Sequence, residues 1–112
     1  NNKALIIVDG VVRDRRHLAQ DGMLTIVVAI ERDTLSIVSG PDVITRGFVY
    51  VKESEELINK VKELSVNELE KCLGMGVIEW YVLKSSIKKS VENYIYEKTK
   101  RRPTIIPIIM ET

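Results

Sequence analysis

The sequence has one cysteine, one histidine and few aromatic residues, and each scarcity excludes a class of protein. A single cysteine cannot form an internal disulfide, which fits a reducing cytoplasm, and we expect Cys72 to act as a small apolar residue on a helix face. His17 alone cannot build a histidine metal cluster or an acid–base pair. No apolar run approaches the roughly 20 residues of a membrane span and no signal peptide is visible, so we expect no membrane contact.

Motifs that hold phosphates, metals or bases are also missing from the sequence. It contains neither a Walker-type loop nor a GxGxxG loop, and Gly74-Met75-Gly76 is typical of a helix end. Cysteine, histidine and aspartate do not recur at the spacing of metal ligands. The GxxG loop of KH domains and the aromatic signature of RRM domains are absent too. We therefore expect no catalytic residue, metal ligand or cofactor within this chain.

What the chain does have is clustered charge. The net charge is only +1, from 17 basic and 16 acidic residues, which is a small excess for a protein that binds nucleic acid by charge alone. A local cluster nevertheless matters more than the sum for the field around it. The first basic cluster is Arg13, Arg15, Arg16 and His17, and the second is Lys98, Lys100, Arg101 and Arg102.

The first basic cluster fits several partners. In an extended segment Arg13, Arg15 and His17 would share one face. Arginine forks bind phosphates and carboxylates alike. The cluster therefore predicts intramolecular or interdomain salt bridges, contact with an RNA backbone, or plain surface charge, and the sequence leaves these alternatives open.

Hydrophobic patterns in the first half of the chain predict strands. Residues 5–8 are a short apolar run, and residues 11–18 are a possible second short strand. Residues 23–30 are rich in β-branched side chains and apolar on both faces, as expected of a central strand. A short polar turn joins them to residues 35–38, which predicts a hairpin. The sequence Gly40-Pro41-Asp42 then predicts the end of that strand, followed by a helical turn over residues 43–46.

The second half predicts two helices and a closing strand. A first apolar helix face, after Ser54 as N-cap, consists of Leu57, Val61, Leu64, Leu69 and Cys72. A second consists of Trp80, Leu83, Ile87, Val91, Tyr94 and Ile95. We expect the aromatic residues Trp80, Tyr94 and Phe48 to fill core positions rather than to stack on bases.

Pro103 separates the second helix from an apolar C-terminal segment. Five large side chains there are expected to be buried, namely Ile105, Ile106, Ile108, Ile109 and Met110. Pro107 lacks an N–H donor, so either this strand should lie at a sheet edge or Pro107 should face a gap in the hydrogen-bond ladder. Residues 1–112 are thus expected to form one two-layer α+β domain, a small mostly antiparallel sheet packed against two helices, with the C-terminal strand returning to the sheet.

Three blocks of sequence resemble one family. They are residues 13–22 (RDRRHLAQDG), 38–51 (VSGPDVITRGFVYV) and 97–111 (EKTKRRPTIIPIIME). Their order and spacing resemble the C-terminal domain of ribonuclease J, a family of metallo-β-lactamase/β-CASP ribonucleases. One departure is a glycine-rich stretch that the family places after the equivalent of Gly10 and that this sequence lacks.

The resemblance implies a domain that follows a catalytic body in a longer chain. The full enzymes degrade and process RNA as 5′-to-3′ exonucleases and endonucleases, with two zinc ions held by histidines and aspartates of the β-lactamase domain. Those ligand motifs are not in this sequence, so the resemblance transfers no catalytic or metal residue. It implies support of oligomer assembly and full activity through other domains or subunits of the parent enzyme.

Two hypotheses follow for this chain. The first is a non-catalytic accessory domain that helps to assemble the ribonuclease. The second is an RNA-binding module that guides substrate through the two basic clusters. A freestanding enzyme is a third class, for which the sequence supplies no residue set.

Overall fold

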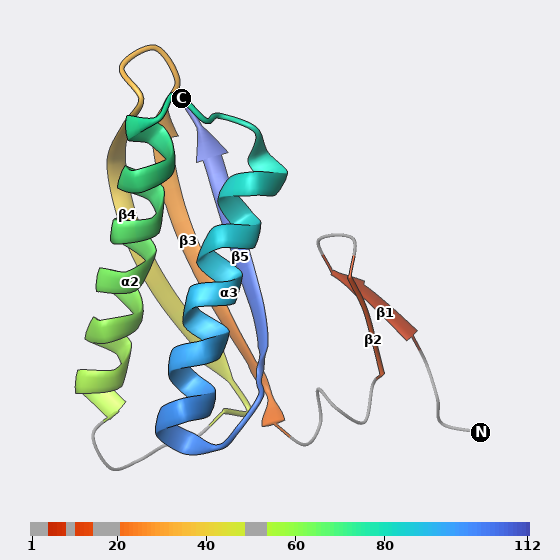
Figure 1. The fold of residues 1–112 in the computed structure, drawn as a ribbon. Helices are drawn as coiled ribbons and strands as arrows, with labels where there is room; N and C mark the ends of the chain where they lie inside the picture. Colours follow the sequence, from red (N-terminus) through yellow and green to blue (C-terminus); the bar gives the residue numbers. More distant parts are fainter. Residues whose placement is uncertain (1–4, 9–10, 15–20, 49–53) are drawn as a thin grey trace.

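Two helices cover one face of a three-stranded sheet in the computed structural model (Figure 1), which describes residues 5–8, 11–14, 21–48 and 54–112. The elements follow one another along the chain as β1 (Leu5–Val8), β2 (Val11–Asp14), β3 (Met23–Glu31), β4 (Ser36–Arg46), α2 (Ser54–Gly74), α3 (Trp80–Thr99) and β5 (Thr104–Glu111). Neither of these helices is long and apolar enough to cross a membrane.

The sheet has the strand order β4-β3-β5. Strand β3 pairs antiparallel with β4, as the predicted hairpin requires, and parallel with β5, so the sheet is mixed. A parallel return needs a long crossover connection, which the two helices supply. Strands β1 and β2 form a separate antiparallel pair. The prediction of a two-layer α+β fold with a returning C-terminal strand is confirmed.

The core lies between the sheet and the helices. Buried and half-buried side chains alternate along most of β3, because successive side chains of a strand point to opposite faces of the sheet. The β3 side chains Leu24, Ile26 and Val28 are at most 1% exposed, and they face the helix layer. Helix α3 meets them with side chains four residues apart, which lie on one face. These are Leu83, Ile87, Val91 and Ile95. Cys72 is buried in the same core, as expected for a small apolar residue on a helix face.

The burial predicted for the C-terminal segment is only half right. Ile105 and Ile109 are buried, but Ile108 is 40% exposed and Met110 is 50% exposed. Successive side chains of a strand point to opposite faces, and helices cover only one face of this sheet. An apolar run in a strand therefore does not guarantee burial on both sides.

Pro107 lies on an edge strand, as predicted. The N–H groups of Thr104 and Thr112, at the two ends of β5, donate to the carbonyls of Gly22 and Ile30 at 2.9 Å each. Because the direction of the backbone groups alternates along a strand, the odd-numbered positions face away from β3. Pro107 is one of these positions, so its missing donor weakens the free edge instead of the sheet.

The end predicted for the second hairpin strand is wrong. Strand β4 continues through Gly40 and Pro41 to Arg46, and no helical turn forms over residues 43–46. Its register against β3 shifts twice, around Ala29, as in β-bulges. Gly40 has φ +85° and approaches the carbonyl of Val27, and the Gly40–Pro41 peptide is cis. A glycine and a proline are thus accommodated in a bulged edge strand.

Both ends of helix α2 lie close to the residues predicted from the sequence. Helix α2 ends as expected in the glycines, since the N–H groups of Gly76 and Val77 bind the carbonyls of Leu73 and Cys72 at 2.9 Å each, in a Schellman arrangement. The helix begins at Ser54 itself, the residue expected as N-cap.

Phe48 is buried and Tyr94 packs against the core, as predicted for both aromatic residues. Trp80 is not a core residue, because it is 38% exposed. It is the first residue of α3, and the buried residues of that helix begin only at Leu83.

Candidate functional site

Three of the four residues of the second basic cluster lie in a short loop with a fixed backbone between α3 and β5. We call residues 100–103 the basic loop, whereas Lys98 lies in the last turn of α3. Lys100 follows the last helical residue with φ 61°, and its N–H donates to the carbonyl of Tyr96 at 2.8 Å. The N–H of Arg101 donates to the hydroxyl of Thr99 at 3.0 Å. A left-handed lysine in place of the usual glycine therefore ends the helix.

The far end of the basic loop is tied to the sheet. The N–H of Arg102 donates to a carboxylate oxygen of Asp21 at 3.0 Å, and Asp21 lies just before β3. The next residue, Pro103, is buried. Both ends of the loop are thus anchored, and its side chains project from a defined backbone.

Two cations of the basic loop lie against one aromatic ring. The guanidinium carbon of Arg102 is 4.0 Å from the ring centroid of Tyr96, and the ammonium of Lys100 is 5.2 Å from it. Contacts of this kind are favourable cation–π interactions. Among the residues that the structure describes, neither cation has a carboxylate within ion-pair distance.

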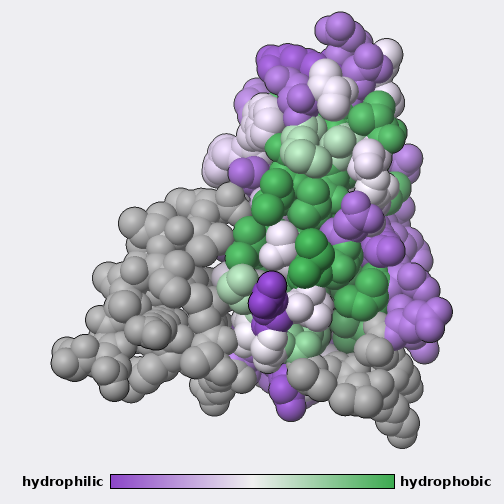
Figure 2. Space-filling view, turned by 180° about the vertical axis from the view of Figure 1, so that it is seen from behind, coloured by the Kyte–Doolittle hydropathy of each residue, from purple (hydrophilic) through white to green (hydrophobic). Residues whose placement is uncertain are grey.

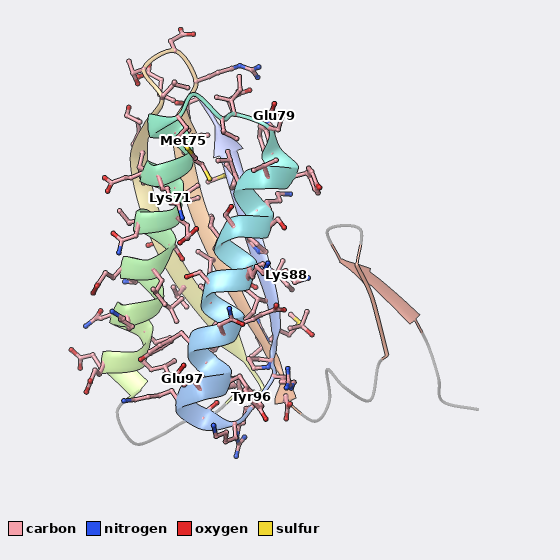
Figure 3. The ribbon with its side chains drawn as sticks, viewed as in Figure 1. Lys71, Met75, Glu79, Lys88, Tyr96 and Glu97 are labelled. Carbon is pink, nitrogen blue, oxygen red and sulfur yellow. The ribbon has the colours of Figure 1, made fainter. Side chains whose placement is uncertain are left out.

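A surface cavity of about 650 Å³ lies beside this ring. Its lining includes the two cations together with the carboxylates of Glu92 and Glu97, so its charge is mixed. Figure 3 shows Tyr96 and Glu97 on the same last turns of α3. The cavity can therefore hold an anionic group only on the side of the cations.

The predicted site residues are not all gathered at this place. Lys98 lines a different cavity, with Lys60 and Tyr94, between α2 and α3. Arg13 lies in β2, opposite Ile6. Arg15, Arg16 and His17 lie outside the described residues. The structure thus brings together Lys100 and Arg102, with Arg101 exposed between them.

The second candidate surface is the sheet face that the helices leave uncovered, which we call the open face. Figure 2 shows it as a hydrophobic area seen from the side opposite the helices. Its most exposed apolar residues are Ile44, which is 54% exposed, Val38, which is 52% exposed, and Met110 and Ile108. The open face consists of Met23, Thr25, Val27 and Ala29 of β3, Val38 and Ile44 of β4, and Ile106, Ile108 and Met110 of β5.

The open face was not predicted from the sequence, because all the C-terminal apolar residues were expected to lie in the core. Residues 105–110 are all apolar, so no signal in the sequence separates the side chains of the open face from those of the core. Among the described residues, no group of three or more histidine, cysteine, aspartate or glutamate side chains is placed to hold a metal ion.

The fold and these two surfaces define a small two-layer α+β domain that presents an apolar sheet face and a basic loop. The family model of the ribonuclease J C-terminal domain matches residues 10–112, and the chain belongs to this family. The chain is 44% identical over 115 residues to Ribonuclease J2 of Bacillus subtilis (strain 168), covering 95% of the chain and 21% of that relative.

A second relative gives the same picture. The chain is 38% identical over 119 residues to Ribonuclease J 2 of Staphylococcus aureus (strain NCTC 8325 / PS 47), covering 98% of the chain and 21% of the relative. The chain thus spans about a fifth of the length of the curated relatives that it matches.

Proposed function

We propose that this chain is the non-catalytic accessory domain of a ribonuclease J-like enzyme in the cytoplasm. In this proposal RNA cleavage, both 5′-to-3′ exonucleolytic and endonucleolytic, is carried out by a catalytic body outside this chain that holds two zinc ions. Membership of the C-terminal domain family and the small share of each relative that the chain covers support this division. The single histidine supports it too, because the chain cannot supply a histidine zinc cluster.

The role we propose for the domain is assembly of the enzyme, and the open face carries this proposal. Large apolar side chains that remain exposed and contiguous on a small domain mark an interaction surface. Ile44 lies on β4, and Ile108 and Met110 lie on β5, the two strands that flank β3. Each of these side chains is at least 40% exposed. Contact with another domain or subunit of the parent enzyme would remove them from water.

The experiment is sedimentation of the parent enzyme with charges placed on the open face. Ile44→Lys and Ile108→Lys should shift the oligomer to smaller species, because a buried lysine without a partner is costly. Met75→Lys is the matched control, since Met75 is 67% exposed and lies at the end of α2, in the helix layer (Figure 3). An oligomer of unchanged size in both open-face variants would refute the assembly role.

Guidance of RNA by the basic clusters is a second candidate function. The observation in its favour is that Lys100 and Arg102 project from an anchored loop with no carboxylate partner among the described residues. It predicts that removing the domain lowers kcat/KM on long RNA more than on a dinucleotide, because only the long substrate reaches the loop. An equal loss on both substrates would leave assembly as the sole function.

A further inference from the structure

We infer that the stack of Tyr96 and Arg102 is a binding site for one phosphodiester group of single-stranded RNA. The inference rests on the proposed function, because RNA is the polyanion that an accessory domain of a ribonuclease meets. It goes further by assigning the contact to one side chain and one supporting ring.

The geometry of Arg102 suits this task. A guanidinium group stacked on an aromatic ring keeps its N–H donors, which lie in its own plane and point away from the ring. At 4.0 Å from the ring centroid, the group is held by Tyr96, and among the described residues no carboxylate forms an ion pair with these donors. Arginine donors match phosphate oxygens in a bidentate way that a lysine cannot reproduce.

The site is also organised before any ligand arrives. The backbone N–H of Arg102 is bound to Asp21, and Pro103 follows directly in a buried position. Ordering a free surface arginine on binding costs side-chain entropy. Part of that cost is already met in folding, which distinguishes Arg102 from the exposed lysines elsewhere on the chain.

Neighbouring charges set the strength and selectivity of the site. Lys100 lies 5.2 Å from the same ring and adds a second positive charge. Glu92 and Glu97 also line the cavity, and the carboxylate of Asp21 accepts a hydrogen bond from the backbone N–H of Arg102. These carboxylates oppose a phosphate group, so the site is a weak, salt-sensitive contact along an RNA strand and not a pocket for a free phosphate ion.

The test is a titration of the 112-residue chain with labelled oligouridine of about 12 nucleotides, a length suited to a single-strand contact. Fluorescence anisotropy at low salt measures the affinity. Arg102→Ala should weaken binding about five- to tenfold and make the slope of log affinity against log salt shallower by about 0.7. Arg102→Lys should recover the slope but only part of the affinity, because the charge returns without the fork.

Two further variants separate a built site from general attraction. Tyr96→Leu keeps every charge and should still weaken binding about two- to fivefold, through loss of the cation–π contact. Glu97→Gln should tighten binding, because it removes a repelling carboxylate. Lys71→Ala is the control, since Lys71 is exposed at the opposite end of the helix layer from Tyr96 (Figure 3), and it should change the affinity less than twofold.

Three results would overturn the inference. These are no binding of oligouridine at low salt, an effect of Lys71→Ala equal to that of Arg102→Ala, and no effect of Tyr96→Leu in a variant whose circular dichroism is unchanged. Competition by polyglutamate as strong as that by oligouridine of equal charge would instead assign the loop to an acidic protein partner. None of these outcomes bears on the sedimentation of the open-face variants, so failure here and failure of the assembly role are distinguishable.

Discussion

The two-sided character of β5 can be tested with two isoleucines that are three residues apart. Ile105 is 1% exposed and lies in the core, whereas Ile108 is 40% exposed and lies on the open face. Replacing each by alanine removes the same atoms from the same strand. Any difference in the free energy of unfolding therefore reports the surroundings of the two side chains and not their chemistry.

The expected costs differ clearly. Isoleucine to alanine removes three carbon groups, worth about 2.4 kcal/mol of transfer free energy at full burial. At Ile105 the cavity left behind raises the cost into the range of about 2–5 kcal/mol. Ile108 is already 40% exposed, which limits its transfer cost to about 1.4 kcal/mol, and on an open surface no enclosed cavity remains. The first change should thus cost about 1.4 to 3.6 times as much as the second.

Urea unfolding followed by circular dichroism measures both costs. With a slope of about 1–3 kcal/mol per M, Ile105→Ala should lower the midpoint by about 1 M or more. The measurement belongs at low protein concentration, because association through the open face would add stability to the folded state. Equal costs, or a larger cost for Ile108→Ala, would refute the assignment of the two faces.

Four further substitutions test other parts of the fold by the same unfolding assay or by light scattering. Gly22 has φ +79° and a Cβ there would clash with the backbone of Gly47, so Gly22→Ala should cost about 3 kcal/mol or more, while Gly74→Ala, with nothing within 4 Å, should be neutral or stabilise by up to about 1 kcal/mol. The buried hydroxyl of Thr104 has no partner among the described residues, so Thr104→Val should stabilise the chain by about 1 kcal/mol, and a loss of stability would mean that the hydroxyl has a bonding role. Pro107→Val should restore a donor on the free edge and raise light scattering with concentration, whereas unchanged scattering would mean that the proline does not protect this edge.

The sequence correctly predicted the elements whose apolar residues recur with a single period. The helical spacing of Leu83, Ile87, Val91 and Ile95 gave the buried face of α3 correctly. The edge position of β5 was predicted from a single feature, the backbone N–H that Pro107 lacks. These predictions succeed because local pattern and tertiary environment demand the same residue type.

The errors have tertiary causes. Gly40-Pro41 is typical of a turn. In β4, however, the two residues lie where the register against the paired strand β3 shifts, as in a β-bulge. The C-terminal isoleucines are equally apolar, and only the one-sided helix layer decides which of them is buried. Which cations of the second cluster meet also depends on the chain's path, since the left-handed Lys100 turns Arg102 back towards Tyr96.

The two proposed surfaces make a joint prediction that depends on the length of the RNA. Arg102 and Ile108 are separated by about 20 Å of extended chain, beyond the range at which substitutions usually couple. On short oligouridine, Ile108→Lys should therefore leave the affinity unchanged.

If the open face assembles the parent enzyme as proposed, the assembly would hold several basic loops at once, and a long RNA could engage more than one of them. Its apparent affinity then rises through effective concentration without any new contact. Ile108→Lys should accordingly weaken binding of the parent enzyme to long RNA while sparing short RNA. Equal affinities of the wild-type and Ile108→Lys enzymes for long RNA would show that the open face does not bring basic loops together, even if each loop binds RNA by itself.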